Sequence, residues 1–363
     1  MKRPPARARF TAPPLSSAAA RWSALLLTLG LLYLASPVFV PLAFAIFILA
    51  LVAPLQAVLR PRMGAVLAAT LTLVLTLAAA LLFLSLAAWG FTLVAQWIIA
   101  NAARLQRLFS METADMHPRL AIMVTLFLDN FNASLLLRAI QEVLSRLNSM
   151  AGLVFLSFLF ITLGVYELHD APARLRQLLP RADHWIAVAG SIARKLRRYM
   201  LIRTIASVLT GVTVWLFAIY AGLELATAWG GLAFLLNYIP FLGPLLATLF
   251  PSFFAFVQFE SLQGALAVFL ILNVIQIGYG CYLEPRLAGN AFSLSPLLVM
   301  LAVFFWGLVW GIPGTFIGVP MLIAATSCWS ASRPPGSPVS DRPGIRPHAS
   351  HPRTALEPTG DEP

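Results

Sequence analysis

Charged residues are scarce in this sequence, and cysteine is scarcer still. Only 11% of the 363 residues are charged, 60% are hydrophobic, and the mean hydropathy is +0.84. Such a chain has too little polar surface to coat a soluble globule of this length. Cys281 and Cys328 stand in apolar surroundings without metal-like spacing, which argues against a disulfide framework and a zinc site. The composition therefore predicts an all-α, polytopic membrane protein.

The sequence also lacks the motifs of enzymes and of nucleic-acid-binding proteins. It offers no nucleophile with a base, no cluster of metal ligands and no phosphate-binding glycine loop with a lysine. The net charge of +11 comes from basic residues at the ends of apolar runs and in the tails. That placement is typical of membrane topology signals. We therefore expect no enzyme activity, no cofactor, no bound metal and no nucleic-acid partner.

Eight apolar runs predict about eight membrane crossings, since about 20 residues suffice to cross a bilayer. The runs are 22–35, 38–58, 65–100, 150–168, 204–223, 228–257, 262–283 and 294–325. The first run resembles the apolar core of a cleaved signal peptide. The second run follows it at once, however, which favours a helical hairpin. Together the runs define a transmembrane domain over 22–326.

The segments outside the runs differ in composition. Residues 101–148 mix both charges with apolar residues at helical spacing, which predicts an extracytoplasmic amphipathic helical insertion. Residues 169–203 are basic and amphipathic, and we expect them along the cytoplasmic membrane surface. The ends, 1–21 and 327–363, are rich in proline and arginine, and 327–363 cannot bury enough apolar surface to fold.

Arginine and lysine in short loops mark the cytoplasmic side of a membrane protein. The N-terminus, the loop with Arg60 and Arg62, the 169–203 segment and the C-terminal tail all carry such residues. Eight crossings place all of them inside, so both termini are predicted to be cytoplasmic. A segment that enters and leaves from one side would put the basic tail outside, which makes a re-entrant hairpin the less favoured interpretation.

The run 228–257 is interrupted near its middle by Asn-Tyr-Ile-Pro-Phe-Leu-Gly-Pro, residues 237–244. Two prolines and a glycine remove backbone hydrogen bonds that lipid cannot replace, so the freed groups must face protein or a watery cavity. Transporters hold cargo at such breaks. The candidate residues are hydrogen-bonding side chains, proline-broken helix ends and a glycine that permits close approach: Asn237, Tyr238, Pro240, Pro244 and Gly243. The simpler alternative is a kink that improves packing.

A second motif, Glu284-Pro285-Arg286, ends the next apolar run. The carboxylate and the guanidinium can neutralise each other, while the proline ends the hydrogen-bond ladder. A charge inside the bilayer costs about 2.5–3.5 kcal/mol on insertion scales, so these residues are functional candidates. We expect them to line or gate the path together with Gln276. The alternative is that they anchor the helix end at the interface.

The last apolar run carries small residues at helical spacing, namely glycines at positions 307, 311, 314 and 318. This pattern lets helices approach closely, either within a subunit or between the subunits of a homo-oligomer. Trp306 and Trp310 are interpreted as packing residues or interface anchors.

Several motifs occur in a fixed order: Tyr238-Ile-Pro-Phe-Leu-Gly-Pro, Leu283-Glu-Pro-Arg-Leu-Ala-Gly, Leu294-Ser-Pro-Leu, Trp306-Gly, Trp310-Gly, Gly314 and Val319-Pro320. This order resembles the autoinducer-2 exporter family of bacterial permeases, over about 22–325 and most strongly from Arg203 onward. The resemblance implies a multi-pass transporter of the bacterial inner (plasma) membrane. Some members export a small furanosyl quorum-sensing signal, and others are proposed to exchange sodium for protons.

We therefore expect a permease that moves a small polar molecule by alternating access around the broken helix, with autoinducer-2 as a candidate. Its partners would be the lipid bilayer and a small-molecule or ion substrate. The alternatives are a sodium/proton antiporter of the same family and a non-transporting membrane scaffold.

Overall fold

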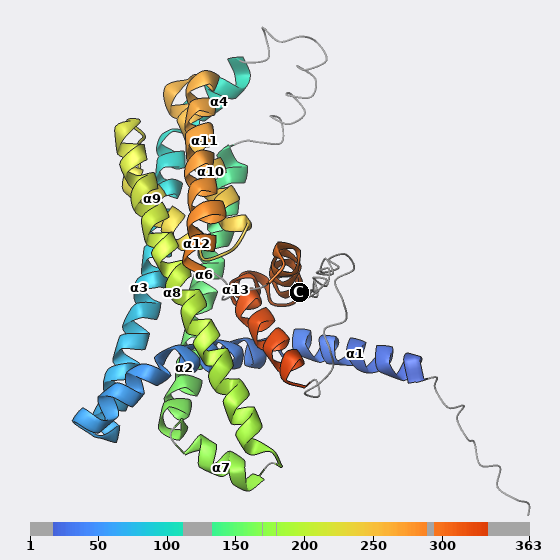
Figure 1. The fold of residues 1–363 in the computed structure, drawn as a ribbon. Helices are drawn as coiled ribbons and strands as arrows, with labels where there is room; N and C mark the ends of the chain where they lie inside the picture. The colour runs from blue at the N-terminus through green and yellow to red at the C-terminus, as the bar shows by residue number, and fades with distance from the viewer. Residues whose placement is uncertain (1–16, 112–132, 169, 179, 289–293, 333–363) are drawn as a thin grey trace, which may run out of the picture.

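A computed structural model of the chain describes residues 17–111, 133–168, 170–178, 180–288 and 294–332 (Figure 1). These residues form helices joined by short turns. In chain order the helices are α1 (Ser17–Leu34), α2 (Ser36–Met63), α3 (Ala65–Ala100), α4 (Ala102–Met111), α6 (Ala133–Glu167), α7 (Ala171–Leu178), α8 (Ala182–Tyr220), α9 (Ala226–Leu236), α10 (Leu242–Phe259), α11 (Leu262–Ile277), the π-helix η1 (Gly278–Leu283), α12 (Glu284–Ala288) and α13 (Pro296–Ala331). Within this part of the chain, seven helices are long and apolar enough to cross a membrane, which confirms the polytopic all-α prediction.

The longest helices run side by side along one axis, with α4 at one end of the bundle and α7 at the other (Figure 1). We refer to these as the α4 end and the α7 end. Helices α3, α6 and α8 have 36, 35 and 39 residues. At 1.5 Å per residue each is longer than the roughly 30 Å of bilayer hydrocarbon. Each must therefore tilt or project beyond the membrane.

Two predicted boundaries disappear inside these long helices. The basic segment expected along the membrane surface forms α7 and the first half of α8, and α8 continues without a break into the apolar stretch that follows. Likewise α6 begins at Ala133 and runs through the predicted boundary near 148 to Glu167. A helix propagates through a change of composition because each added residue gains a backbone hydrogen bond. Residues 182–203 are therefore not a separate helix, and their position along the membrane surface stays a prediction.

The broken run forms a hairpin made of α9 and α10. Gln258, near the end of α10, donates from Nε2 to the Gly222 carbonyl at 2.7 Å and accepts from the Glu224 amide at 2.9 Å. Both partners precede α9, so the hairpin enters and leaves from the α4 end. The run thus reverses direction, as a re-entrant segment would, and does not pass straight through.

Glycines bring this hairpin close to its neighbours. A Cβ on Gly211 of α8 would lie 2.9 Å from the Gly230 carbonyl oxygen, and a Cβ on Gly230 would lie 2.9 Å from that of Gly211. A Cβ on Gly243 would overlap the carbonyl oxygen of Leu236, across the hairpin tip. The close approach predicted for Gly243 is therefore made by the chain itself.

Helix α13 is a second hairpin. Gly311 adopts φ 65° and ψ −145°, outside the helical region, and divides the helix into two arms. The two arms pack together through glycines. A Cβ on Gly318 would lie 3.0 Å from the Ala302 carbonyl oxygen, and a Cβ on Gly314 would overlap the Trp306 carbonyl oxygen. The prediction that 294–325 crosses in one span is thus wrong. The packing role is confirmed within one subunit for Gly307, Gly314 and Gly318, whereas Gly311 has no close neighbour and forms the turn.

The ends of the transmembrane domain also differ from expectation. Run 22–35 falls in α1, whose apolar part, Ala20–Leu34, is shorter than the seven candidate spans. Helix α13 continues to Ala331, so the predicted tail does not begin at 327. Most of the two tails and the middle of the 101–148 insertion lie outside the described residues.

Candidate functional site

The tip of the α9–α10 hairpin lies between α3 and α8, near the middle of both helices. Its backbone makes a γ-turn at Phe241, which has φ 64° and ψ −55°, while the Leu242 amide donates to the Pro240 carbonyl at 2.8 Å. This positive-φ turn is rare and strained, and such strain concentrates at functional sites. The tip is therefore a structural outlier within the site.

The tip satisfies much of its own backbone. The Gly243 amide donates to the Ile239 carbonyl at 2.9 Å, and the Ile239 amide donates to the Leu236 carbonyl at 2.8 Å. The sequence analysis left open whether the freed backbone groups face protein or a watery cavity. These groups bond to the protein itself. Because the helix termini are occupied in this way, side chains are what the tip offers to a ligand.

Two predicted residues turn their side chains toward α8. Asn237 is only 4% exposed and donates from Nδ2 to the Ser207 hydroxyl at 3.2 Å. Tyr238 donates its hydroxyl hydrogen to the Thr204 hydroxyl at 3.1 Å. The tip and α8 therefore form a buried polar contact where most surrounding side chains are apolar.

An ion pair extends this contact. The Arg203 guanidinium lies 2.5 Å from the Glu284 carboxylate, with the two side chains 8% and 23% exposed. Leaving a charge this buried without a partner is costly, which explains the pairing. We call Arg203, Thr204, Ser207, Asn237, Tyr238 and Glu284 the tip cluster. It joins α8, the hairpin tip and α12.

The predicted pair of Glu284 with Arg286 is wrong. Residues two apart on a helix do not face each other, and Arg286 is exposed with its guanidinium 4.5 Å from the ring centre of Tyr282. Pro285 is exposed as well, so neither residue joins the tip cluster. The assignment of Glu284 to the site is the part of this motif that the geometry supports.

The expectation that Pro285 ends the helix is also wrong. Proline inside an α-helix clashes with the carbonyl four residues earlier. Here six residues before Glu284 form η1, and the Glu284 amide donates to the Tyr279 carbonyl, five residues back. This wider winding lets the helix continue to Ala288. Such π segments are frequent at functional sites.

Several buried polar atoms on α8 and α11 have no hydrogen-bond partner within the described part of the chain. They are Arg203 Nε, Thr210 Oγ1 and Gln276 Nε2. Gln276 is 6% exposed, and its role in lining a path stays a prediction. Since buried polar groups are usually paired, these atoms are available to a bound molecule.

Aromatic rings close one side of the tip cluster. The Tyr238 ring lies 5.5 Å from Phe83 of α3 and 5.9 Å from Phe316 of α13, measured between ring centroids. Phe83 and Phe316 also line a cavity of about 320 Å³ between α2, α3, α6 and α13, which we call the apolar cavity. The rings thus stand between the polar cluster and this cavity, so the cluster is closed on that side.

The sequence missed Arg203, Thr204 and Ser207 as site residues. Arg203 was interpreted as part of the basic topology signal. A sharper signal was present, because Arg203, Ser207 and Thr210 share one helical face inside an apolar stretch. Polar residues at this spacing in a spanning helix face the protein interior and not lipid.

Apolar helices that enclose a polar cluster, two helical hairpins and unpaired polar atoms inside the described bundle define a polytopic membrane protein. Broken helices inside such bundles are common in transporters. A family model described as "AI-2E family transporter" matches residues 22–333. The chain belongs to this family of membrane transporters.

Curated relatives agree with this assignment. The chain is 30% identical over 186 residues to the AI-2 transport protein TqsA of Escherichia coli, covering 51% of this chain and 53% of the relative. It is 31% identical over 191 residues to a putative transport protein of Borreliella burgdorferi, covering 52% of each. It is 27% identical over 195 residues to the putative transport protein YhhT of Escherichia coli, covering 54% of this chain and 55% of the relative. The matches span about half the length of these relatives.

Proposed function

We propose that this protein carries a small, oxygen-rich polar molecule across the membrane, with the tip cluster as its binding site. The observation that carries the proposal is the contact of Asn237 and Tyr238 with the polar face of α8, deep in an apolar bundle. A polar group in such surroundings is costly unless it is paired. Asn237 and Tyr238 are paired with α8, and polar groups kept inside a membrane bundle are commonly functional, which supports a ligand-binding role.

The chemistry of the tip cluster and of the neighbouring helix α11 favours a cargo with acceptor oxygens. Arg203 Nε and Gln276 Nε2 are donors that the described part of the chain leaves unpaired. Hydroxyl and carbonyl oxygens of a cargo would accept from them. Autoinducer-2 is a candidate because the name of the relative TqsA links that protein to AI-2 transport.

The closed tip supports an alternating-access mechanism. In this conformation the cluster is buried, and the rings of Phe83 and Phe316 cover one side of Tyr238. A cargo reaches the cluster only if the α9–α10 hairpin shifts relative to α3, α8 and α13. Movement of the hairpin would therefore open the cluster to one side of the membrane and then to the other.

Sodium/proton exchange by the same cluster is the second candidate, because Glu284 places a carboxylate beside Arg203 within the bundle. Binding of a proton or a sodium ion at Glu284 would weaken this ion pair. The two functions make different demands on the cluster. Exchange requires the carboxylate, whereas polar cargo transport also requires Asn237 and Tyr238.

The test is flux in proteoliposomes that contain the full chain. We expect efflux of autoinducer-2 from wild type and its loss in Arg203→Gln, Glu284→Gln and Asn237→Leu. The matched control is Arg286→Gln, which removes an exposed arginine near the site and should transport normally. Proton movement driven by sodium that survives Asn237→Leu and fails in Glu284→Gln would favour the exchanger. Absence of both fluxes under imposed gradients would contradict transport and favour the scaffold.

A further inference from the structure

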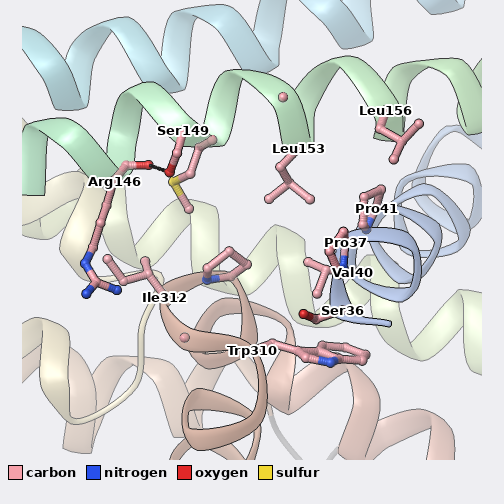
Figure 2. Close-up of a pocket in the computed structure, with 14 residues that line it drawn as sticks. Ser36, Pro37, Val40, Pro41, Arg146, Ser149, Leu153, Leu156, Trp310 and Ile312 are labelled. Carbon is pink, nitrogen blue, oxygen red and sulfur yellow. Dashed lines mark hydrogen bonds between the residues drawn. The ribbon is translucent and has the colours of Figure 1, made fainter. Parts of the chain in front are cut away.

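A second cavity lies next to the apolar cavity, at the tip of the α13 hairpin. It has a volume of about 490 Å³ and is bounded by α6, the α1–α2 junction and residues 310–313 (Figure 2). Most of its lining is apolar, but the lining also includes Arg146, Ser149 and Ser36, and we call it the polar cavity to distinguish it from the first. Met150, Leu153 and Pro313 line both cavities, which therefore adjoin.

The two cavities follow the polarity of α6. Arg146 is the last charged residue on this helix before Glu167, and the stretch between them is almost entirely apolar. The polar cavity contacts α6 from Arg146 to Leu156, and the apolar cavity continues to Ile161. The first thus begins where a membrane interface would meet α6, and the second lies beside the part suited to hydrocarbon.

The chemistry of each cavity matches one half of an amphiphile. Phenylalanine, leucine and isoleucine dominate the apolar cavity, and such a lining favours an aliphatic chain. Arg146 donates from Nε to Glu142 at 2.8 Å, in a pair whose side chains are 58% and 61% exposed. So exposed a pair contributes little to stability, and a guanidinium binds phosphate well.

We propose that these adjoining cavities form a binding site for one anionic phospholipid. The phosphate would lie at Arg146 in the polar cavity, and one acyl chain would extend past Met150 and Leu153 into the apolar cavity. The chain would then reach Phe83 and Phe316, the rings that cover Tyr238. This proposal stands apart from the transport of any cargo, since a lipid can occupy the site whether or not the tip cluster transports.

The test compares phosphatidylglycerol with phosphatidylcholine on the purified full-length protein, by native mass spectrometry and thermal unfolding. We expect phosphatidylglycerol to be retained more strongly. Loss of one basic contact should weaken its binding roughly fivefold in Arg146→Gln and leave phosphatidylcholine unchanged. The control Arg138→Gln removes an exposed arginine from the same helix, outside both cavities, and should match wild type. Equal phosphatidylglycerol binding by wild type and Arg146→Gln would overturn the proposal.

The apolar cavity, which would hold the acyl chain of the lipid, needs a variant of its own. Ala80 lines the apolar cavity, and Ala80→Phe should fill it and weaken both lipids alike. A photoactivatable acyl chain on wild-type protein provides a second measurement that does not depend on whether this variant folds. Cross-links to residues of α2, α3 and α6 that line the apolar cavity, such as Met150 and Leu153 of α6, would support the site. Cross-links confined to other faces, or unchanged lipid binding by a folded Ala80→Phe protein, would refute it.

Discussion

The two hairpins have the same construction but different tips. Each turns at a residue with positive φ, Phe241 in one and Gly311 in the other, and each packs its arms through a glycine that leaves no room for a Cβ. The α9–α10 tip carries Asn237 and Tyr238 against polar residues of α8. The α13 tip carries Trp310, whose Nε1 donates to the Leu32 carbonyl of α1 at 3.1 Å.

This difference indicates a division of labour. Broken helices expose polar backbone at membrane depth, and each hairpin must satisfy or cover it. At the α13 tip an indole ring packs and anchors the turn, with Trp306 at 4.4 Å between ring centroids. At the α9–α10 tip the cover includes an ion pair and unpaired donors. Two similar hairpins therefore differ in what covers their tips, and we propose that one tip anchors its hairpin while the other binds a ligand.

The largest expected effect comes from closing the glycine contacts. Gly243→Ala and Gly314→Ala each place a Cβ on a backbone carbonyl of the opposite arm. We expect each to lose stability at the upper end of about 1–3 kcal/mol, because backbone cannot yield as a flexible side chain can. Thermal unfolding of purified protein would measure this. Gly30→Ala, where a Cβ meets nothing within 4 Å, should be neutral or slightly stabilising.

The next largest effect is expected from the Arg203–Glu284 ion pair, which lies beside the α9–α10 tip and has no counterpart among the described residues of the α13 tip. Arg203→Gln leaves Glu284 in the bundle without its guanidinium. Because the Glu284 side chain is partly exposed, we expect a loss of about 2 kcal/mol, that of a hydrogen bond to a charged group, together with loss of flux. The double variant with Glu284→Gln should regain much of the stability, because no unpaired charge remains, but none of the flux. Recovery of flux in the double variant would show that the pair is structural and would remove it from the ligand site.

A smaller change should separate function from anchoring. Tyr238→Phe keeps the ring and removes the hydroxyl that bonds to Thr204, whereas Trp310→Phe removes the indole bond to Leu32. Each should cost about 1 kcal/mol of stability. We expect Tyr238→Phe to lower flux roughly fivefold, the rate equivalent of one hydrogen bond, and Trp310→Phe to transport at the wild-type rate. Equal flux in both variants would contradict the division of labour.

The smallest expected effect concerns the attachment of α13 to α8. Lys195 donates from Nζ to the Ser327 hydroxyl at 2.9 Å. Lys195→Met removes this bond while keeping most of the side-chain length, and we expect a loss below about 1 kcal/mol with unchanged flux. Hydrogen exchange should rise in the second arm of α13 and stay constant in α9 and α10. Faster exchange in α9 and α10 would show that the two hairpins are coupled.

Some of the site was readable from the sequence because its signals are local. The break at residues 237–244 follows from two prolines and a glycine, and Asn237 and Tyr238 were chosen on that ground. Glu284 was also identified, but with the wrong partner. Its true partner, Arg203, lies 81 positions away, so no local spacing could reveal the pair. The Phe83 and Phe316 rings that cover Tyr238 are likewise distant in sequence.

The sequence by itself determined that this protein is an all-helical membrane protein, and where its helices are interrupted. Those properties depend on composition and on the backbone limits of proline and glycine, which act within a few residues. Only the tertiary structure decided that both interruptions are hairpin turns and not kinks in crossing helices. A kink and a reversal remove the same local hydrogen bonds. The choice between a kink and a reversal depends on distant packing partners. Helix α9 packs on α8, and the second arm of α13 packs on the first arm.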